Sequence, residues 1–268
     1  MRVTRPLLSF FWLGVLCFPV GSQQASSTVT VVPQRDPQAV GILRQSVGAM
    51  AAVPPSDSAA TGNVTITTGP LSTQGTVTIL TKGLTETSVQ YQMPDNSWTL
   101  ISSNGQANKV ESSQTVAYPL EFAASSRCVY FPLPYLAGIL SNPDYSILFV
   151  GKETLGSAAV FHIAVQNTFV SSPKYQFLSP FTLAEIWFDA ATGLPKQISY
   201  NRQSGRGASP KILISVSYSN YQVVSGVLHP FTIEESVNGT LWATTSIQSV
   251  TFNTGLTETN FPISAAGN

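Results

Sequence analysis

The feature that most constrains this chain is an alternation of apolar and polar residues with a period of two, which begins at Val64 and continues to Leu100. This spacing puts every second side chain on the same face of a strand, so that one face packs on a core and the other faces water. Breaks containing Gly or Pro divide the stretch into four segments. The apolar members of these segments are Val64 and Ile66, Val77 and Ile79, Val89, Tyr91 and Met93, and Trp98 and Leu100. We therefore predict four strands of an antiparallel meander.

A hairpin signal lies at residues 186–201, with the sequence IWFDAATGLPKQISYN. Asp189 can accept backbone N–H bonds across the turn, Gly193 can take a positive φ, and Pro195 can start the returning strand. Further strands are predicted at residues 145–150, 158–165, 183–188, 211–218, 221–224, 227–235 and 241–252. Charged residues make up only 10% of the chain. Thr and Ser fill the surface positions that Lys and Glu usually occupy. This composition favours a β protein that works outside the cytoplasm.

Asp36 followed by Pro37 predicts the start of a helix, because Asp can accept hydrogen bonds from free N–H groups and Pro loses none at the first helical position. The apolar stripe that follows has helical spacing and consists of Val40, Leu43, Val47 and Met50. Pro54 ends the pattern. Gly41 and Gly48 each cost the helix about 1 kcal/mol relative to Ala, so we expect it to dock on the sheet.

The alternation disappears between residues 112 and 142, where three prolines interrupt apolar segments. Tyr135, Leu136, Ile139 and Leu140 have the spacing of a short helix. This insertion is too apolar for an exposed loop. We therefore expect it to pack against the sheet or to lie across its mouth as a lid.

Residues 1–22 have the pattern of a secretory signal peptide. Their apolar run of about 14 residues is shorter than the roughly 20 residues that span a membrane. Cleavage would leave residues 23–35 as a flexible leader, with no transmembrane span in the mature chain, and would place the protein in the periplasm or the medium. Lipid attachment at Cys17 is a weaker alternative, because the bulky Leu16 stands where lipoprotein signals have a small residue.

Charge and cysteine content exclude several kinds of partner. The 13 Lys and Arg residues equal the 13 Asp and Glu residues, and removal of Arg2 and Arg5 leaves a net charge of −2. The basic residues are also scattered, so neither nucleic acid nor an anionic membrane surface is an expected partner. Cys128 would be the only cysteine of the mature chain, which excludes an internal disulfide and a thiolate metal cluster.

The sequence contains no residue set that predicts catalysis. His162 and His229 are the only histidines, and neither stands in a nucleophile or metal-ligand motif. Asp189 is explained by its turn. Glu234 and Glu235 are adjacent on a predicted strand, so they point to opposite faces and cannot form a carboxylate pair. We therefore predict a protein that is not an enzyme and has no catalytic residues, metal or cofactor.

The order of these parts resembles that of the periplasmic lipoprotein-carrier (LolA-like) superfamily and its secreted bacterial relatives. The matching segments are, in order, DPQAVGILRQSVGAM, PLPYLAGILSNPDY, WFDAATGLPKQI, YQVVSGVLHPFTI and FNTGLTETNFPI. The resemblance implies one domain at residues 36–263, followed by a tail at residues 264–268. It also implies a mainly β fold with a few helices, in which a curved antiparallel sheet forms an incomplete, half-open barrel with helices packed in or over its concave face.

Strands that curve around a mobile apolar helix would leave a cavity, where each buried ligand methylene is worth about 0.8 kcal/mol. The predicted lining from the strands consists of Tyr91, Trp98, Phe161, Ile163, Trp187, Ile198, Tyr200, Ile214, Val216 and Trp242. The predicted lining from the lid consists of Leu133, Leu136, Ile139 and Leu140. The alternative for each is a place in a packed core. Arg44 is the candidate for contact with a polar head group, with a solvated helix face as its alternative.

The sequence and its resemblance to LolA-like proteins together predict an exported, non-enzymatic carrier. The resemblance implies that it binds a hydrophobic small molecule, a lipid or the acyl chains of a lipoprotein in an apolar half-barrel cavity. The alternative is an interaction or sensor module of the cell envelope, which contacts a protein partner and transfers no lipid. A cavity in the structure would favour the carrier. A concave face filled by its own side chains would favour the module.

Overall fold

The computed structural model describes residues 32–112, 114–125, 129–203 and 211–263. The predicted signal peptide at residues 1–22, the predicted tail at residues 264–268 and both cysteines lie outside these ranges. Within these ranges, no helix has the length and apolar character needed to cross a membrane.

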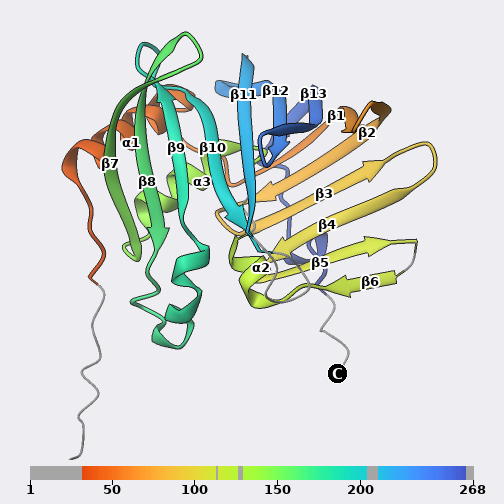
Figure 1. The fold of residues 1–268 in the computed structure, drawn as a ribbon, viewed down its shortest axis with the longest axis horizontal. Coiled ribbons are helices and arrows are strands. Elements are labelled where there is room, and N and C mark those ends of the chain that lie inside the picture. The colour runs from red at the N-terminus through yellow and green to blue at the C-terminus, as the bar shows by residue number, and fades with distance from the viewer. Residues whose placement is uncertain (1–31, 113, 126–128, 204–210, 264–268) are drawn as a thin grey trace, which may run out of the picture. The chain divides into compact units, whose positions relative to one another are not determined.

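One sheet of thirteen antiparallel strands forms the scaffold (Figure 1). The strands are β1 (Asp57–Thr68), β2 (Leu71–Lys82), β3 (Glu86–Gln92), β4 (Ser97–Ser103), β5 (Gln106–Glu111), β6 (Gln114–Ala117), β7 (Tyr145–Leu155), β8 (Ala158–Asn167), β9 (Ala184–Asp189), β10 (Pro195–Arg202), β11 (Ile212–Val224), β12 (Val227–Val237) and β13 (Thr240–Phe252). Their order across the sheet is β6-β5-β4-β3-β2-β1-β13-β12-β11-β10-β9-β8-β7. In the described part of the chain, β6 and β7 are the two outer edges and do not pair, so the sheet is not closed into a barrel.

Most neighbouring strands are also consecutive in the chain. The exception is the pair of β1 and β13, the first and last strands, which places Val64 opposite Thr245. The up-and-down path is interrupted between β6 and β7, where the chain forms α2 (Leu120–Ser125) and α3 (Pro132–Ser141). These two helices are therefore the insertion that the loss of alternation predicted.

The remaining helix, α1 (Pro37–Met50), packs against α3 and contacts β7 and β12. Two short 3-10 segments, η1 (Pro173–Phe181) and η2 (Glu258–Asn260), complete the described elements. Figure 1 shows that the strand direction turns strongly from β7 to β6 and that α1 and α3 lie against one face of β7 to β9. The curved sheet with helices on its concave face confirms the predicted half-open barrel.

The first helix begins at the predicted residue. Oδ1 of Asp36 accepts hydrogen bonds from the N–H groups of Gln38 and Ala39 at 2.7 and 3.0 Å, and a proline occupies the first helical position. Val40 and Val47 of the predicted stripe are only partly buried. The buried line of α1 consists of Ala39, Leu43, Ser46 and Met50. The apolar spacing located the helix correctly. It chose Val40 and Val47, however, where the preceding residues, Ala39 and Ser46, are the buried ones.

The leader predicted for residues 23–35 is fixed to the sheet at its end. The carbonyl of Gln34 accepts a hydrogen bond of 2.7 Å from the N–H of Ile147 on β7. The guanidinium of Arg35 donates to the carbonyl of Leu140 in α3 at 2.7 Å. The prediction of flexibility is therefore wrong for the last two residues of the leader, because they pair with β7 and cap α3.

The hairpin of β9 and β10 confirms the predicted turn. Oδ1 of Asp189 accepts hydrogen bonds from the N–H groups of Ala191 and Thr192 at 3.0 and 2.9 Å. Gly193 has a φ of 74°, a conformation that side chains disfavour, and β10 begins at Pro195. These contacts account for Asp189 without any chemical role.

Some strands differ from the prediction. β5 and β6 extend the predicted four-strand meander, and β6 lies in the segment that we expected to be irregular. Residues 114–116 of β6 are exposed at the sheet edge, so no buried alternation marks this strand. β11 is a single strand where we predicted two, and Asn220 at a φ of 53° interrupts its regular pattern.

Candidate ligand-binding site

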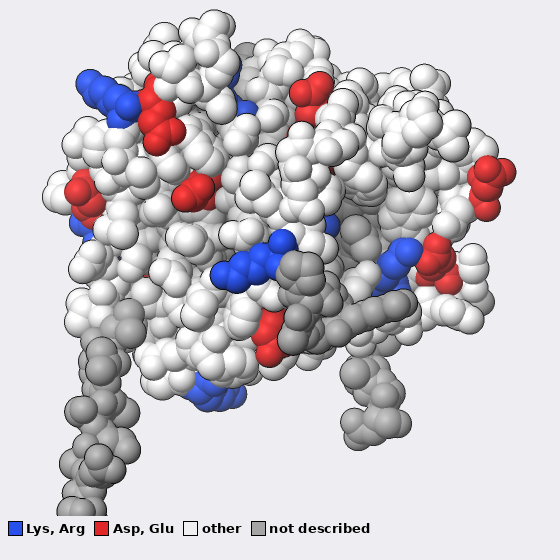
Figure 2. Space-filling model, viewed as in Figure 1, with Lys and Arg blue, Asp and Glu red and all other residues white. Residues whose placement is uncertain are grey.

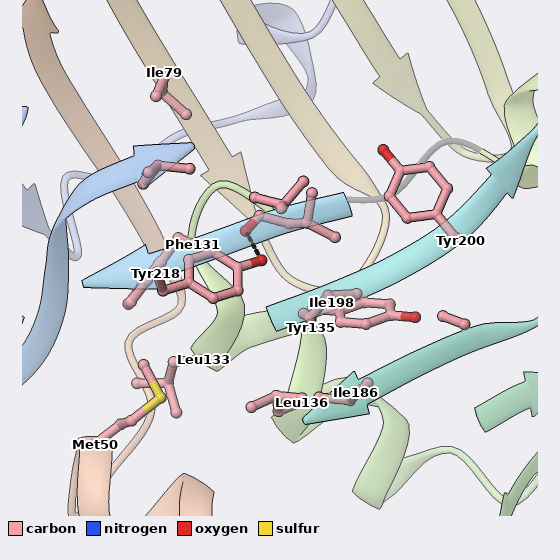
Figure 3. Close-up of a cluster of buried hydrophobic side chains, with 14 of the residues drawn as sticks. Met50, Ile79, Phe131, Leu133, Tyr135, Leu136, Ile186, Ile198, Tyr200 and Tyr218 are labelled. Carbon is pink, nitrogen blue, oxygen red and sulfur yellow. Dashed lines mark hydrogen bonds between the residues drawn. The ribbon is translucent and has the colours of Figure 1, made fainter. Parts of the chain in front are cut away.

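α3 fills the middle of the concave face. The side chains of Leu133, Leu136 and Ile139 are each 0% exposed. Figure 3 shows Leu133 and Leu136 within the cluster of buried side chains that also contains Met50 of α1 and Ile186 of β9. We expected these α3 residues to cover a cavity as a lid. In the structure they occupy that space themselves, and none of the cavities described below is lined by them.

Most of the predicted lining residues on the strands lie in this same core. The buried ones are Tyr91, Ile163, Ile198, Tyr200, Ile214 and Val216. The partly buried ones that pack against the core are Trp98 and Trp242, and Leu140 of α3 packs there as well. Phe161 lies opposite Phe188 in the sheet register but outside this cluster, with Nζ of Lys152 5.6 Å from its ring. The concave face is therefore mainly packed, and an opening has to be sought at its margin.

Trp187 lies on the other face of the sheet. Its neighbours along β9, Ile186 and Phe188, are in the core, so Trp187 points away from it. The ring of Trp187 stacks on that of His162 at 4.4 Å, and its Nε1 donates to Glu153 at 3.0 Å. The bonds from Trp187 and His162 lower the pKa of the Glu153 carboxyl. The prediction that Trp187 lines the concave cavity is wrong.

Among the described residues, Arg202 and not Arg44 is the cation that faces the concave side of the strands. Arg44 is exposed on the outer side of α1, where water solvates it, so its prediction as a head-group contact is wrong. Arg202 ends β10, and it shares a strand face with Ile198 and Tyr200, which are four and two residues before it. The even spacing between these three residues is visible in the sequence and places Arg202 on the same strand face as two predicted lining residues.

Arg202 belongs to a buried polar network that crosses the concave face. Its Nη2 donates to the hydroxyl of Tyr200 at 3.1 Å and lies 3.5 Å from Oε1 of Glu235 on β12. The hydroxyl of Tyr130, just before α3, donates to Oε2 of Glu235 at 2.8 Å. The hydroxyls of Tyr130 and Tyr91 are 2.9 Å apart, which brings β3 into the network. Polar groups thus connect both halves of the sheet through the segment before α3.

An Arg–Glu pair lies at the centre of this network. Burial raises the pKa of the Tyr130 hydroxyl, and the Glu235 carboxylate raises it further, so this hydroxyl keeps its proton. Burial alone would lower the pKa of Arg202, but Tyr200 and Glu235 outweigh it and raise the pKa of the guanidinium. Arg202 and Glu235 form an ion pair in which the Glu235 side chain is 4% exposed and the Arg202 side chain is 24% exposed.

A cavity of about 50 Å³ lies beside Arg202, between the strands and α2. Its lining residues are Thr87, Val89, Leu100, Ile101, Ser102, Ala107, Asn108, Tyr118, Phe122, Tyr130, Tyr200 and Arg202. Two buried polar atoms of this lining, Nε of Arg202 and Oγ1 of Thr87, have no hydrogen-bond partner among the described residues. Unsatisfied buried polar atoms are rare in native proteins, and a water molecule, an ion or a ligand can supply their partner.

A second cavity of about 130 Å³ lies on the other side of α2. Its lining residues are Leu84, Thr85, Ser102, Gly105, Gln106, Ala123, Ala124, Tyr135, Tyr145, Asn167, Phe169 and Thr182. Ser102 lines both cavities, which are therefore separated mainly by α2. The predicted lining residue Tyr200 faces the first of them. No sequence signal marked α2, because it is only six residues long and has no regular apolar stripe.

α2 buries less apolar surface than α3, since Leu120 is 42% exposed whereas most of the large side chains of α3 are fully buried. It contacts β5, β10 and η1, and Oγ of Ser125 accepts a hydrogen bond of 3.1 Å from the N–H of Gln203. The ring of Phe122 stacks on that of Tyr118 at 3.9 Å. Four backbone carbonyls around the end of α3, by contrast, accept hydrogen bonds from Arg35 at 2.7 to 3.5 Å. α2 is therefore the element that can leave the concave face at lower cost.

The histidines lie outside this site. His229 is 2% exposed and packs at a tilt on Phe131 with ring centres 4.7 Å apart, while His162 stacks on Trp187 on the other face. Among the described residues, no group of three or more His, Cys, Asp or Glu side chains could hold a metal ion. Figure 2 shows scattered charges of both signs on a mostly uncharged face.

The sequence matches no protein-family model and no curated protein. Solved structures do match. A Vibrio parahaemolyticus domain assigned to the outer membrane lipoprotein-sorting proteins aligns over 84% of this chain and 96% of its own, with a TM-score of 0.56 and 14% identity. A LolA superfamily protein of Nitrosomonas europaea aligns over 84% and 97%, with a TM-score of 0.56 and 12% identity. This chain has the LolA-like fold.

A DUF1329 family protein of Desulfovibrio piger is also similar, with a TM-score of 0.53, 12% identity, and coverage of 84% of this chain and 96% of its own. The predicted resemblance is therefore confirmed for the fold. Proteins that share a fold at such low identity differ widely in function, so the LolA-like fold by itself identifies no ligand.

Proposed function

We propose that this protein is exported to the cell envelope and binds a hydrophobic ligand, a lipid or the acyl chains of a lipoprotein, on the concave face of its LolA-like sheet. The observation that carries the proposal is the pair of cavities on the two sides of α2. Both have more apolar than polar surface, and both lie between the two halves of a curved sheet.

The ligand would enter by displacing α2. Pockets that hold small molecules have volumes of about 300–1,000 Å³, whereas the two cavities measure about 130 and 50 Å³. The structure is therefore a closed state of the proposed site. Departure of α2 would join the cavities along Ser102 and leave α3 in place, since Arg35 holds its end.

The energy of such an exchange is favourable for a long alkyl chain. Each methylene that leaves water is worth about 0.8 kcal/mol, so ten of them contribute about 8 kcal/mol. That sum has to exceed the cost of undocking α2, which buries the side chains of Ala123 and Ser125. Binding of this kind selects an open state that the free protein populates weakly.

Two further observations support a place in the envelope. Residues 1–22 have the pattern of a secretory signal. The similar domain of Vibrio parahaemolyticus is assigned to the lipoprotein-sorting proteins of the outer membrane. A soluble half barrel with an apolar interior suits the transfer of acyl chains through an aqueous compartment.

The alternative is an envelope interaction module that transfers no lipid. The packing of α1 and α3 favours it, because these helices fill most of the concave face with side chains of the protein itself. The two functions differ in whether an apolar ligand can displace α2 and bind in its place.

The test is saturable binding of N-phenyl-1-naphthylamine, whose fluorescence rises in apolar surroundings, to the delipidated protein, with displacement by 1-lauroylglycerol. We expect one binding site per chain. Ser102→Phe fills the wall shared by the two cavities and should abolish binding, while the control Ser72→Phe, at an exposed position of β2, should retain it. Absence of saturable binding to the unaltered protein would reject the carrier and favour the interaction module.

A further inference from the structure

We propose that the cavity beside Arg202 binds an uncharged hydrogen-bond acceptor of the ligand, such as the carbonyl oxygen of an acyl ester, through Nε of Arg202 and Oγ1 of Thr87. The inference rests on the proposed function and specifies the polar end of its ligand. It assigns Arg202 to head-group recognition, a role that the sequence had suggested for Arg44.

The donors of Arg202 are only partly used. A guanidinium carries five N–H donors, and Nη2 directs its two toward Tyr200 and Glu235. Nε is buried and, like Nη1, makes no hydrogen bond to any described residue. Oγ1 of Thr87, on the β3 side of the same cavity, is also buried and has no hydrogen-bond partner in the described part of the chain. An acceptor between them would satisfy groups from both halves of the sheet.

The charge of the network favours a neutral acceptor. Glu235 already balances Arg202, and its carboxylate is held by Tyr130 at 2.8 Å. A ligand carboxylate or phosphate would put a second negative charge beside a carboxylate that is 3% exposed. Like charges at a buried site repel strongly, and an uncompensated buried charge is costly. A carbonyl oxygen accepts the same hydrogen bonds without that cost.

The size of the cavity agrees with a small polar group. A cavity needs about 10–15 Å³ of comparable volume to hold one water molecule, so about 50 Å³ admits a carbonyl group with its adjacent oxygen. The rest of the wall is apolar, with Val89 and Leu100 on the strands and Phe122 on α2. An acyl chain attached to the carbonyl would continue along these side chains once α2 moves.

The experiment compares 1-lauroylglycerol with laurate at pH 8, both below their critical micelle concentrations, as competitors for N-phenyl-1-naphthylamine on the full chain. The two probes have the same alkyl chain, and only laurate is charged. We expect the ester to displace the dye at a concentration at least tenfold lower than laurate. Arg202→Met should remove at least nine tenths of the affinity for the ester, and Thr87→Val should weaken it about threefold. Arg44→Met, on the exposed side of α1, is the matched control and should change nothing.

Glu235→Gln provides a reciprocal test. It removes the balancing charge while retaining a similar shape, so it should raise the affinity for laurate at least tenfold relative to the ester. Equal or tighter binding of laurate to the unaltered protein would overturn the neutral acceptor. Unchanged ester binding in both Arg202→Met and Thr87→Val would show that water alone satisfies these donors and would also overturn it. Dye binding with equal displacement by both probes would leave the proposed function standing, whereas absence of dye binding would end both.

Discussion

The hydroxyl of Tyr130 donates a hydrogen bond of 2.8 Å to Oε2 of Glu235, and this bond connects the segment before α3 to β12. The same hydroxyl lies 2.9 Å from that of Tyr91 on β3. One tyrosine thus links strands that are on opposite sides of the β1–β13 seam. The relationship explains how a mainly apolar concave face tolerates the Arg202–Glu235 ion pair.

Tyr130→Phe tests the weight of this link. The change removes the hydrogen bond from the Tyr130 hydroxyl to the buried Glu235 carboxylate. Among the described residues, Glu235 then keeps Arg202 as its partner, at 3.5 Å. We expect a loss of about 1–3 kcal/mol in the free energy of unfolding, measured by urea denaturation. Tyr175→Phe, at a tyrosine that is 38% exposed, is the control and should stay within about 0.5 kcal/mol. An equal effect of the two changes would contradict the structural role of Tyr130.

Arg35→Met should release the end of α3. The guanidinium donates to the carbonyls of Leu140 and Asn142 at 2.7 and 2.9 Å, where a helix has unpaired acceptors and a partial negative charge. Methionine retains much of the apolar stem and removes these bonds, so we expect a loss of about 2–3 kcal/mol in unfolding free energy. Amide hydrogen exchange should become faster in α3 before it does in the central strands.

Arg44→Met is the matched control for Arg35→Met, because Arg44 is exposed on α1 and makes no hydrogen bond to any described residue. Its effect should stay within about 0.5 kcal/mol. If Arg35→Met leaves both stability and exchange in α3 unchanged, the cap does not hold this helix, and the argument that α2 moves in preference to α3 loses its basis.

His229 should make stability depend on pH. Burial lowers its pKa from 6.5 to about 4, so the folded protein keeps this ring neutral while the unfolded chain protonates it near pH 6.5. The unfolded state then binds more protons, and stability should fall as the pH decreases from about 6.5 toward 4, by about 3 kcal/mol at most. Denaturation curves between pH 4 and 8 measure the slope.

His229→Phe is the comparison for this slope. The ring packs on Phe131, so a second aromatic ring fills the same space without a titratable group. We expect the fall in stability between pH 6.5 and 4 to become smaller in the variant, while stability at pH 8 falls by about 1 kcal/mol because the 2.8 Å hydrogen bond between Nδ1 of His229 and the carbonyl of Pro230 is lost. An unchanged slope would assign the pH dependence to other groups.

Local signals in the sequence identified much of the scaffold. The cap at Asp36, the turn at Asp189 and the alternation from Val64 to Leu100 each depend on residues a few positions apart, and the structure confirms all three. Short-range geometry determines such elements, because the bonds that define them join neighbouring residues. The half-open barrel was predicted from the resemblance of the order of these parts to that of LolA-like proteins.

The candidate site depends on contacts that the sequence does not encode locally. Tyr130 and Glu235 are 105 positions apart, and Arg35 contacts residues more than 100 positions later. Periodicity could assign Trp187 and Arg202 to their opposite strand faces, yet it could not indicate that α3 fills the concave face. Whether a concave face is empty or packed depends on how side chains from several elements fit together.

Two glycines on helices give a final prediction, because the same change should have opposite effects. A Cβ at Gly48 of α1 would meet no atom within 4 Å, so Gly48→Ala gains helix propensity without a clash. We expect the free energy of unfolding to rise by about 1 kcal/mol. A Cβ at Gly138 of α3 would lie 2.8 Å from Cβ of Leu84, in the loop between β2 and β3.

Gly138→Ala gains the same propensity but forces α3 away from Leu84. Overpacking of this kind costs about 1–3 kcal/mol, so the variant should be less stable than the unaltered protein despite the better helix former. Urea denaturation of both variants measures the contrast. Equal stabilisation would mean that α3 shifts freely against the loop before β3, and α3 would then compete with α2 as the element that a ligand displaces. Opposite signs would support a fixed α3 and leave α2 as the movable cover.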